Sequence, residues 1–339
     1  GNGGVLVDNA TGAAAVRGIT VNGYVRTHGN TGSGLTLASL GAIKIASPSA
    51  DSNTDYGALL NNAFAGSLGG ITLLGAEVSF SSNSGYGLDV ASLGAIAITT
   101  TAGLTATGNG SLGARLDNTG SGAASPQTVT IKGPATFSSN GGDGLRITTF
   151  GAISLANLSA SGNGSAGSGY GAYLDNYNEY DFGDTFSPRA VLISGVNTFN
   201  GPTATGLYAV SLGAMSVSNV AASGNGATGA YLDNQWGQPV PAAWTLSGTN
   251  TFDDNGASGL LGYSHGSIRA NSISASSNGG SGAILSTWAW AATFTAGPPR
   301  ISPRPVKRLP FTNRCVISSN WGISTACGLR SRETAWPCS

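Results

Sequence analysis

Apolar and polar residues alternate along this chain in short stretches, which are separated by clusters of Gly, Asn and Ser. Within Leu145–Ile147 and Ile153–Leu155, every second side chain is apolar. A period of two is typical of a β-strand with one buried face. No stretch combines the helical period of 3.6 with helix-forming residues, and Gly, Asn and Ser favour turns. The pattern predicts an all-β chain of short strands.

The strand pattern is organised by a recurring hexapeptide. The sequence GAYLDN stands at 171–176 and 229–234, with looser copies at 4–9, 57–62 and 113–118 and a degenerate copy at 282–287. Two other phrases, of the types "NTF" and "SLGAI", alternate with it in a unit of about 55 residues that occurs about five times. Each unit holds two similar sets of three strands. This arrangement predicts a parallel β-helix of about ten coils, three short strands per coil, built from about five two-coil repeats over residues 1–285.

The hexapeptide itself has a structural interpretation. In the copy at 171–176, we expect Ala172 and Leu174 to point into the core and Tyr173 and Asp175 to point outward. Asn176 would occupy the following turn in a left-handed conformation and form hydrogen bonds with an equivalent Asn in a coil above or below. The motif then recurs because every second coil turns the same corner.

The coil length and phrase pattern resemble the right-handed parallel β-helix repeats of bacterial surface adhesins and, in fold only, those of pectate lyases and their polysaccharide-degrading relatives. The resemblance covers residues 1 to about 285 and implies a right-handed parallel β-helix. It does not imply a single activity, because this fold supports many functions.

Charge and composition change abruptly near the C-terminal end. Residues 1–297 carry 8 Lys and Arg against 14 Asp and Glu, a net charge of −6, whereas residues 298–339 carry 7 against 1, a net charge of +6. All three cysteines, Cys315, Cys327 and Cys338, lie in that last segment. We therefore separate an atypical tail, residues 286–339, which is a terminal cap, a Pro-rich segment without stable structure, or the product of a shifted reading frame.

The body of the chain gives no sign of several common functions. It has no cysteine, no basic stripe of the kind that binds nucleic acid, and no apolar run long enough to span a bilayer. We expect no metal, no cofactor, no nucleic-acid partner and no membrane span.

A row of acidic residues lies at one outward position of the hexapeptides. Asp8, Asp117, Asp175 and Asp233 occupy it, and Asn61 interrupts the row. Because these copies stand on alternate coils, neighbouring carboxylates would lie about 10 Å apart, too far to share a calcium ion. We interpret them as solvated carboxylates at the edge of a turn.

A charged cluster on the same predicted sheet is the candidate for catalysis. Asp89, Arg115, Asp117 and Arg146 would lie within three coils. The resemblance implies a comparison with β-helix lyases, whose corresponding sheet carries calcium-binding Asp residues and a basic residue that abstracts a proton. Here only one or two Asp residues are present and no dense carboxylate pair, so the cluster is either an ion-paired surface or an active site.

Two features are candidates for ligand binding. Tyr173, Tyr208 and Tyr231 fall on consecutive coils and form either a stabilising ladder or a flat platform for sugar rings. The long turn 177–189 adds Glu179, Asp181 and Asp184 together with aromatic residues, a composition that suits sugar or calcium binding as well as simple packing.

The regular repeat and the low charge favour a non-catalytic structural or adhesive region of a secreted or cell-surface protein. The alternative is a carbohydrate-binding or polysaccharide-degrading β-helix protein, a lyase or hydrolase. The expected partners are glycans or other surface proteins, with end-to-end self-association as a further possibility.

Overall fold

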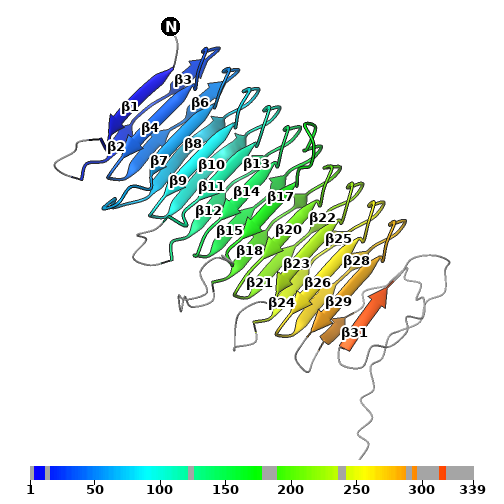
Figure 1. Ribbon diagram of the computed structural model, residues 1–339. Helices are drawn as coiled ribbons and strands as arrows, with labels where there is room; N and C mark the ends of the chain where they lie inside the picture. Colours follow the sequence, from blue (N-terminus) through cyan, green and yellow to red (C-terminus); the bar gives the residue numbers. More distant parts are fainter. Residues whose placement is uncertain are drawn as a thin grey trace, which may run out of the picture.

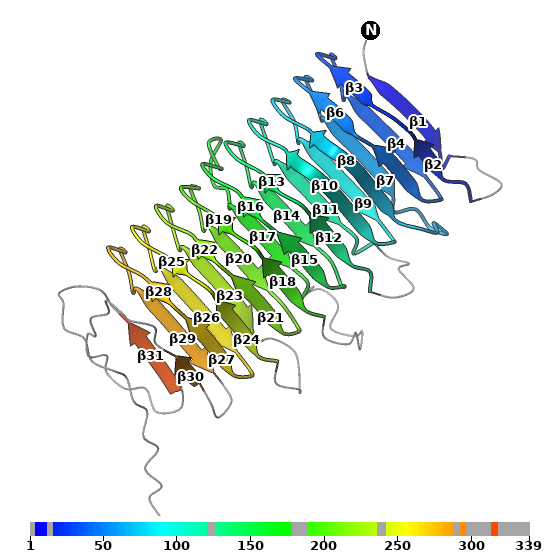
Figure 2. The same cartoon turned by 180° about the vertical axis from the view of Figure 1, so that it is seen from behind.

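The computed structural model describes residues 4–11, 16–120, 126–177, 189–235, 242–287, 292–295 and 313–317, and the statements below concern these residues. They form an all-β solenoid of parallel strands with about ten turns, which Figures 1 and 2 show from opposite sides as one long stack. The predicted fold class and the repeat architecture are therefore confirmed. In this part of the chain, no helix has the length and apolar character needed to cross a membrane.

Each coil contributes strands to three parallel ladders, as the sequence predicted. The first ladder contains the hexapeptide strands and runs β1 (Val5–Asn9), β4 (Leu35–Ser39), β7 (Ala58–Asn62), β9 (Leu88–Ser92), β11 (Ala114–Asp117), β14 (Leu145–Thr148), β17 (Ala172–Asp175), β20 (Leu207–Val210), β23 (Ala230–Asn234), β26 (Leu260–Ser264) and β29 (Ala283–Thr287).

The second ladder runs β2 (Ile19–Val21), β5 (Ile43–Ala46), the first part of β8 (Ile71–Ser79), the first part of β10 (Ile96–Thr105), β12 (Val129–Lys132), β15 (Ile153–Ala156), β18 (Val191–Ser194), β21 (Met215–Ser218), β24 (Trp244–Ser247), β27 (Ile268–Asn271) and β30 (Ala292–Thr295). The third ladder runs β3 (Val25–His28), β6 (Pro48–Asp51), the last parts of β8 and β10, β13 (Ala135–Thr136), β16 (Leu158–Ser159), β19 (Asn197–Thr198), β22 (Val220–Ala221), β25 (Asn250–Thr251) and β28 (Ile273–Ser274).

One strand departs from the parallel arrangement. β31 (Asn313–Ile317) pairs antiparallel with β29, with Ile284 opposite Val316 and Leu285 opposite Cys315. β31 lies in the segment 286–339, whose division from the solenoid stays a prediction.

Large and small side chains alternate from coil to coil in the core. The first inward position of the first ladder alternates Leu and Ala, as in Leu88, Ala114 and Leu145. A second inward position, directly after the third ladder, alternates Phe and Ala in the opposite order. The coil with Ala114 has Phe137 there, and the coil with Leu145 has Ala160. Because interiors are packed to constant density, the two alternations keep the core volume of successive coils similar. This complementarity accounts for a repeat of two coils rather than one.

A ladder of buried asparagines lies at the corner where the third ladder ends. The residue before each Asn lies in the left-handed region, for example Ser139 with a φ of 58°. Asn109 donates from its backbone N–H and from its Nδ2 to Asn140 Oδ1, both at 3.0 Å. Asn140 in turn donates to Asn163 Oδ1 from both groups at 3.0 Å. The ladder contains Asn30, Asn53, Asn83, Asn109, Asn140 and Asn163, and then Asn225, Asn255 and Asn278.

The Asn ladder explains the glycine that begins each coil. A Cβ atom on Gly113 would lie 2.6 Å from Asn140 Nδ2 and 2.5 Å from the carbonyl oxygen of Gly144. Both distances are too short for a side chain, so the Asn ladder and the glycine column depend on each other.

Proline breaks the Asn ladder at one coil. Pro202 follows Gly201, which has a φ of 68°, and therefore stands where the other coils have Asn. Proline has no N–H and no amide side chain to offer. Asn225 Oδ1, which would accept both bonds, is buried without a hydrogen-bond partner.

We predict that Asn140→Ala lowers the free energy of unfolding by about 3 kcal/mol, because it leaves the buried amide groups of Asn109 without their acceptor. Urea unfolding monitored by circular dichroism measures the change, with the outward Thr130→Ala as the control. A loss no larger than that of the control contradicts a stabilising role for the ladder.

We predict that Pro202→Asn raises the free energy of unfolding by about 1 kcal/mol, since the new amide supplies donors to Asn225 Oδ1 and this gain exceeds the entropic advantage of proline in the unfolded chain. The same unfolding experiment tests it. In the double variant with Asn225→Ala the gain should disappear; a gain that survives, or a net loss in the single variant, refutes the explanation.

Candidate functional site

In four of the hexapeptides, an Asp or Asn at the fifth position holds the start of a loop. Asp117 Oδ1 accepts the backbone N–H of Thr119 at 2.9 Å, and Asp175 Oδ1 accepts that of Tyr177 at 2.8 Å. Asn61 makes the same contact through Oδ1 with the N–H of Ala63 at 2.8 Å. The required property is therefore an acceptor at this position rather than a negative charge, which explains the Asn in the row of Asp residues.

The asparagine that ends each hexapeptide holds the far end of the same loop. Asn176 Nδ2 donates to the carbonyl oxygen of Gly151 on the preceding coil at 3.2 Å and to that of Arg189, where the loop returns, at 2.9 Å. On the next coil, Ser211 Oγ donates to the same Arg189 oxygen at 3.2 Å. Asn62, Asn118 and Asn234 bridge two carbonyl oxygens in the same way.

One sequence-based expectation is therefore wrong. Asn176 neither adopts a left-handed conformation nor bonds to an equivalent Asn, because its amide spans the base of the loop instead. The Asn–Asn ladder exists, but its members are the asparagines of the "SGNG"-type phrases, such as Asn163. The inward placement of Ala172 and Leu174 and the outward placement of Tyr173 and Asp175 are confirmed.

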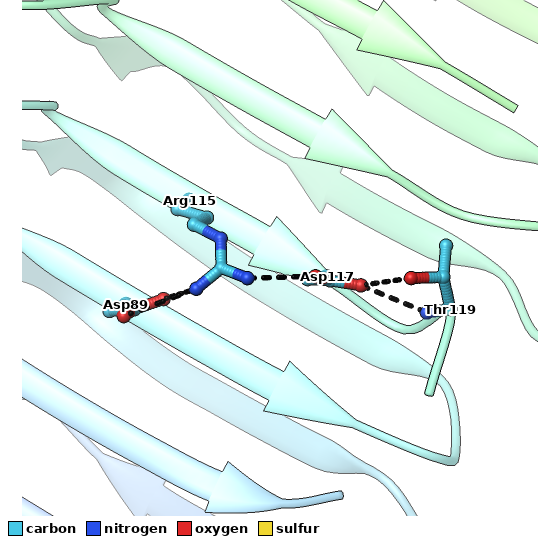
Figure 3. Close-up of polar contacts among 4 residues, drawn as sticks. All are labelled: Asp89, Arg115, Asp117 and Thr119. Carbon is cyan, nitrogen blue, oxygen red and sulfur yellow. Dashed lines mark hydrogen bonds and ion pairs between the residues drawn. The ribbon is translucent and has the colours of Figure 1, made fainter. Parts of the chain in front are cut away.

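The charged candidates form a compact ion-pair network on the first ladder (Figure 3). Arg115 lies beside Asp89 on the neighbouring strand and donates from Nη1 to Asp89 Oδ1 at 3.2 Å. Its Nη2 donates to Asp117 Oδ2 at 2.9 Å. Asp117 also accepts the Thr119 hydroxyl at 2.7 Å, so both of its oxygens are engaged. The network links the strand face to the loop that Asp117 anchors.

Burial and charge act against each other in this network. Burial raises the pKa of Asp89 above its ordinary value of 3.8, although the Arg115 guanidinium lowers it. Burial lowers the pKa of Arg115, but the carboxylates of Asp89 and Asp117 outweigh it and raise the net value. Arg115 therefore stays protonated and serves as the shared counter-ion of two carboxylates.

Arg146 lies beside Arg115 in the ladder but belongs to a different cluster. Its Nε and Nη2 both contact Asp143 Oδ2 at 2.7 Å, and its guanidinium carbon lies 4.9 Å from the ring centroid of Tyr173. The structure thus brings Asp89, Arg115 and Asp117 together and directs Arg146 away from them. Asp143, which the sequence analysis did not single out, is almost fully buried and also accepts the backbone N–H of Tyr170.

The three predicted tyrosines form a continuous stack. The ring centroids of Tyr173 and Tyr208 lie 4.9 Å apart at an interplanar angle of 4°, and those of Tyr208 and Tyr231 lie 4.9 Å apart at 6°. Tyr170 and Tyr263 pack against the stack at larger angles. Rings this close and parallel face one another, so neighbouring faces cover each other rather than forming one flat surface.

Two hydroxyl groups of the tyrosine stack, those of Tyr173 and Tyr231, have raised pKa values. Burial raises the pKa of Tyr173 to about 12. Burial also raises the pKa of Tyr231, whose hydroxyl donates to Asp233 Oδ2 at 2.8 Å. Since Asp233 Oδ1 accepts the N–H of Gln235, this carboxylate joins the tyrosine stack to a loop anchor.

Glu179, Asp181 and Asp184 lie outside the described residues. Among the residues that the structure does describe, no group of three or more His, Cys, Asp or Glu side chains is placed to hold a metal ion.

The chain matches no protein-family model, and no significant match to it is found among curated proteins or solved structures.

The raised pKa of Asp89 gives a pH-dependent prediction. Because the folded state binds this proton more tightly than the unfolded state, Asp89 stabilises the fold at low pH and loses that contribution as the pH rises through its folded pKa. The unfolding free energy of the wild type minus that of Asp89→Asn should therefore be larger at pH 4 than at pH 7. Urea unfolding at both pH values measures it, and a shift in the opposite direction means that the ion pair lowers the pKa of Asp89.

Proposed function

We propose that this chain is a non-catalytic structural or adhesive repeat region of a secreted or cell-surface protein, with glycans or other surface proteins as its partners. The observation that carries the proposal is that its outward carboxylates hold the solenoid together. Asp117, Asp175 and Asp233 accept backbone N–H groups at the starts of loops. Asp89 shares Arg115 with Asp117.

The architecture suits a rigid spacer. Ten coils with a rise of about 4.8 Å give a rod of roughly 50 Å. Each coil contacts its neighbours through three ladders and the side-chain columns, as expected for a solenoid whose stability is spread along its length. The clamped loops begin on every second coil along one edge of the rod, so they are presented at regular intervals.

A second candidate is a carbohydrate-binding or polysaccharide-degrading β-helix protein, a lyase or hydrolase. The observation that favours it is the raised pKa of Asp89, because carboxyl groups with raised pKa values act as proton donors in glycoside-cleaving sites. In that case Asp89, Arg115 and Asp117 would carry the chemistry.

The two candidates are separated by one pair of assays on the purified chain and on Arg115→Ala. We expect that neither protein releases new reducing or unsaturated ends from polygalacturonate and a panel of other polysaccharides. We also expect beads coated with either protein to attach equally to immobilised glycans or cell-surface proteins.

The exposed Arg269 of β27 provides the matched control as Arg269→Ala. Cleavage by the wild type and by this control, but not by Arg115→Ala, overturns the structural proposal in favour of the enzymatic one. Absence of both cleavage and attachment overturns adhesion.

A further inference from the structure

The outward side of the third ladder carries two columns of small polar residues, which we call the hydroxyl face. On the first coil the two outward positions hold Arg26 and His28. From the second coil on, the first column is Ser49, Ser79, Thr105, Thr136, Ser159, Thr198, Ala221, Thr251 and Ser274. The second column lies two residues further along each coil and is Asp51, Ser81, Thr107, Ser138, Ser161, Asn200, Ser223, Asp253 and Ser276. From the second coil on, eight of the nine positions in the first column are thus Ser or Thr.

The spacing of the hydroxyl face is regular in both directions. Consecutive residues of a column are register partners on adjacent parallel strands, as Thr105, Thr136 and Ser159 are, so they repeat about every 4.8 Å along the rod. The two columns are separated by two residues of extended chain, about 6.6 Å. The result is a nearly rectangular net of side chains.

Backbone contacts hold the second column in place. Ser81 Oγ accepts the N–H of Thr107 at 3.2 Å, Ser138 Oγ accepts that of Ser161 at 3.1 Å, and Ser223 Oγ accepts that of Asp253 at 3.1 Å. Each contact joins one coil to the next. The net is therefore preorganised and does not need to be ordered by a ligand.

The middle of the first column is free to bind, whereas Ser49, Ser79 and Ser274 donate hydrogen bonds to Asp51 or Asp253. Within the described structure, the hydroxyl groups of Thr105, Thr136, Ser159 and Thr198 on four consecutive coils make no hydrogen bond to the protein, and all four residues are partly exposed. Between Asp51 and Asp253, neither column contains an ionisable side chain. A ligand for this face should be uncharged, rich in hydrogen-bonding groups and periodic.

We propose that the hydroxyl face binds ice. The prism faces of hexagonal ice present water oxygens in a rectangular net whose two repeat distances are close to those of the two columns. Water molecules that bridge protein groups contribute nearly as much enthalpy as direct hydrogen bonds but lose some entropy when they are immobilised. In ice the water is already ordered, so a rigid, neutral net of hydroxyl groups binds it without that loss.

The proposal does not depend on whether the chain is adhesive or enzymatic, and it is tested with the full chain. Inhibition of ice recrystallisation and incorporation into a slowly growing ice front are measured for wild type, Thr136→Lys and Thr130→Lys. Thr136 and Thr130 are outward, partly exposed threonines of the same coil, but Thr130 lies on the second ladder. Thr136→Val, which replaces the hydroxyl with a methyl group of similar size, provides a milder variant, and circular dichroism reports folding of each.

We expect the wild type and Thr130→Lys to enter the ice and inhibit recrystallisation, and Thr136→Lys to lose both activities. Exclusion of the wild type from ice overturns the proposal, and equal losses in the two lysine variants overturn the assignment to this face. Binding of the wild type to insoluble cellulose or chitin, lost in Thr136→Lys and without any effect on ice, also overturns it and assigns the face to a polysaccharide.

Discussion

The hydrogen bonds that join each coil to the next at its corners are the constraint on which the rest of the structure depends. Along a strand, and for the residues on either side of each corner Asn, the backbone of a neighbouring coil supplies the partners, but the N–H of the Asn itself has no backbone partner. The Asn ladder solves this problem because one amide side chain accepts two hydrogen bonds from the coil before it and donates to a carbonyl oxygen, as Asn140 does with Ala106. Side chains therefore complete the hydrogen bonding between coils at the corner.

The turns after the first ladder share the two-coil period of the core. The turn after the first ladder is short on one coil, where Ser211 or Thr149 bonds to the glycine N–H two residues later. On the alternate coil the turn is a long loop, and an Asp–Asn pair fastens its two ends. Alternation of Leu, Ala and Phe in the core follows the same two-coil period. The row of outward Asp residues in the hexapeptides, which in the sequence could be mistaken for a binding site, is thus part of the loop anchors.

Much of the fold follows from the sequence, but less of the candidate site. The two-residue period and the recurring phrases determine strands, coils and the inward direction of side chains such as Leu174. The partners of polar side chains depend on the neighbouring coil, so the sequence alone did not reveal that Asn176 spans a loop or that Arg146 turns to Asp143. A usable signal did exist for the Asn ladder, because an Asn preceded by Gly, Ser or Asp recurs at the equivalent position of nearly every coil, as in the "SGNG" phrases. The outward period likewise predicts the tyrosine column, whereas its stacking angle depends on packing.

Native-state hydrogen exchange at the corner asparagines tests this account most directly. The backbone N–H groups of Asn53, Asn83 and Asn109 point to side-chain amide oxygens of the next coil. If these bonds set the register between coils, the three amides exchange as slowly as the amides of the neighbouring strands. Exchange at the rate of the exposed turn residues around them would show that the corners are not held by the Asn ladder and would contradict the account.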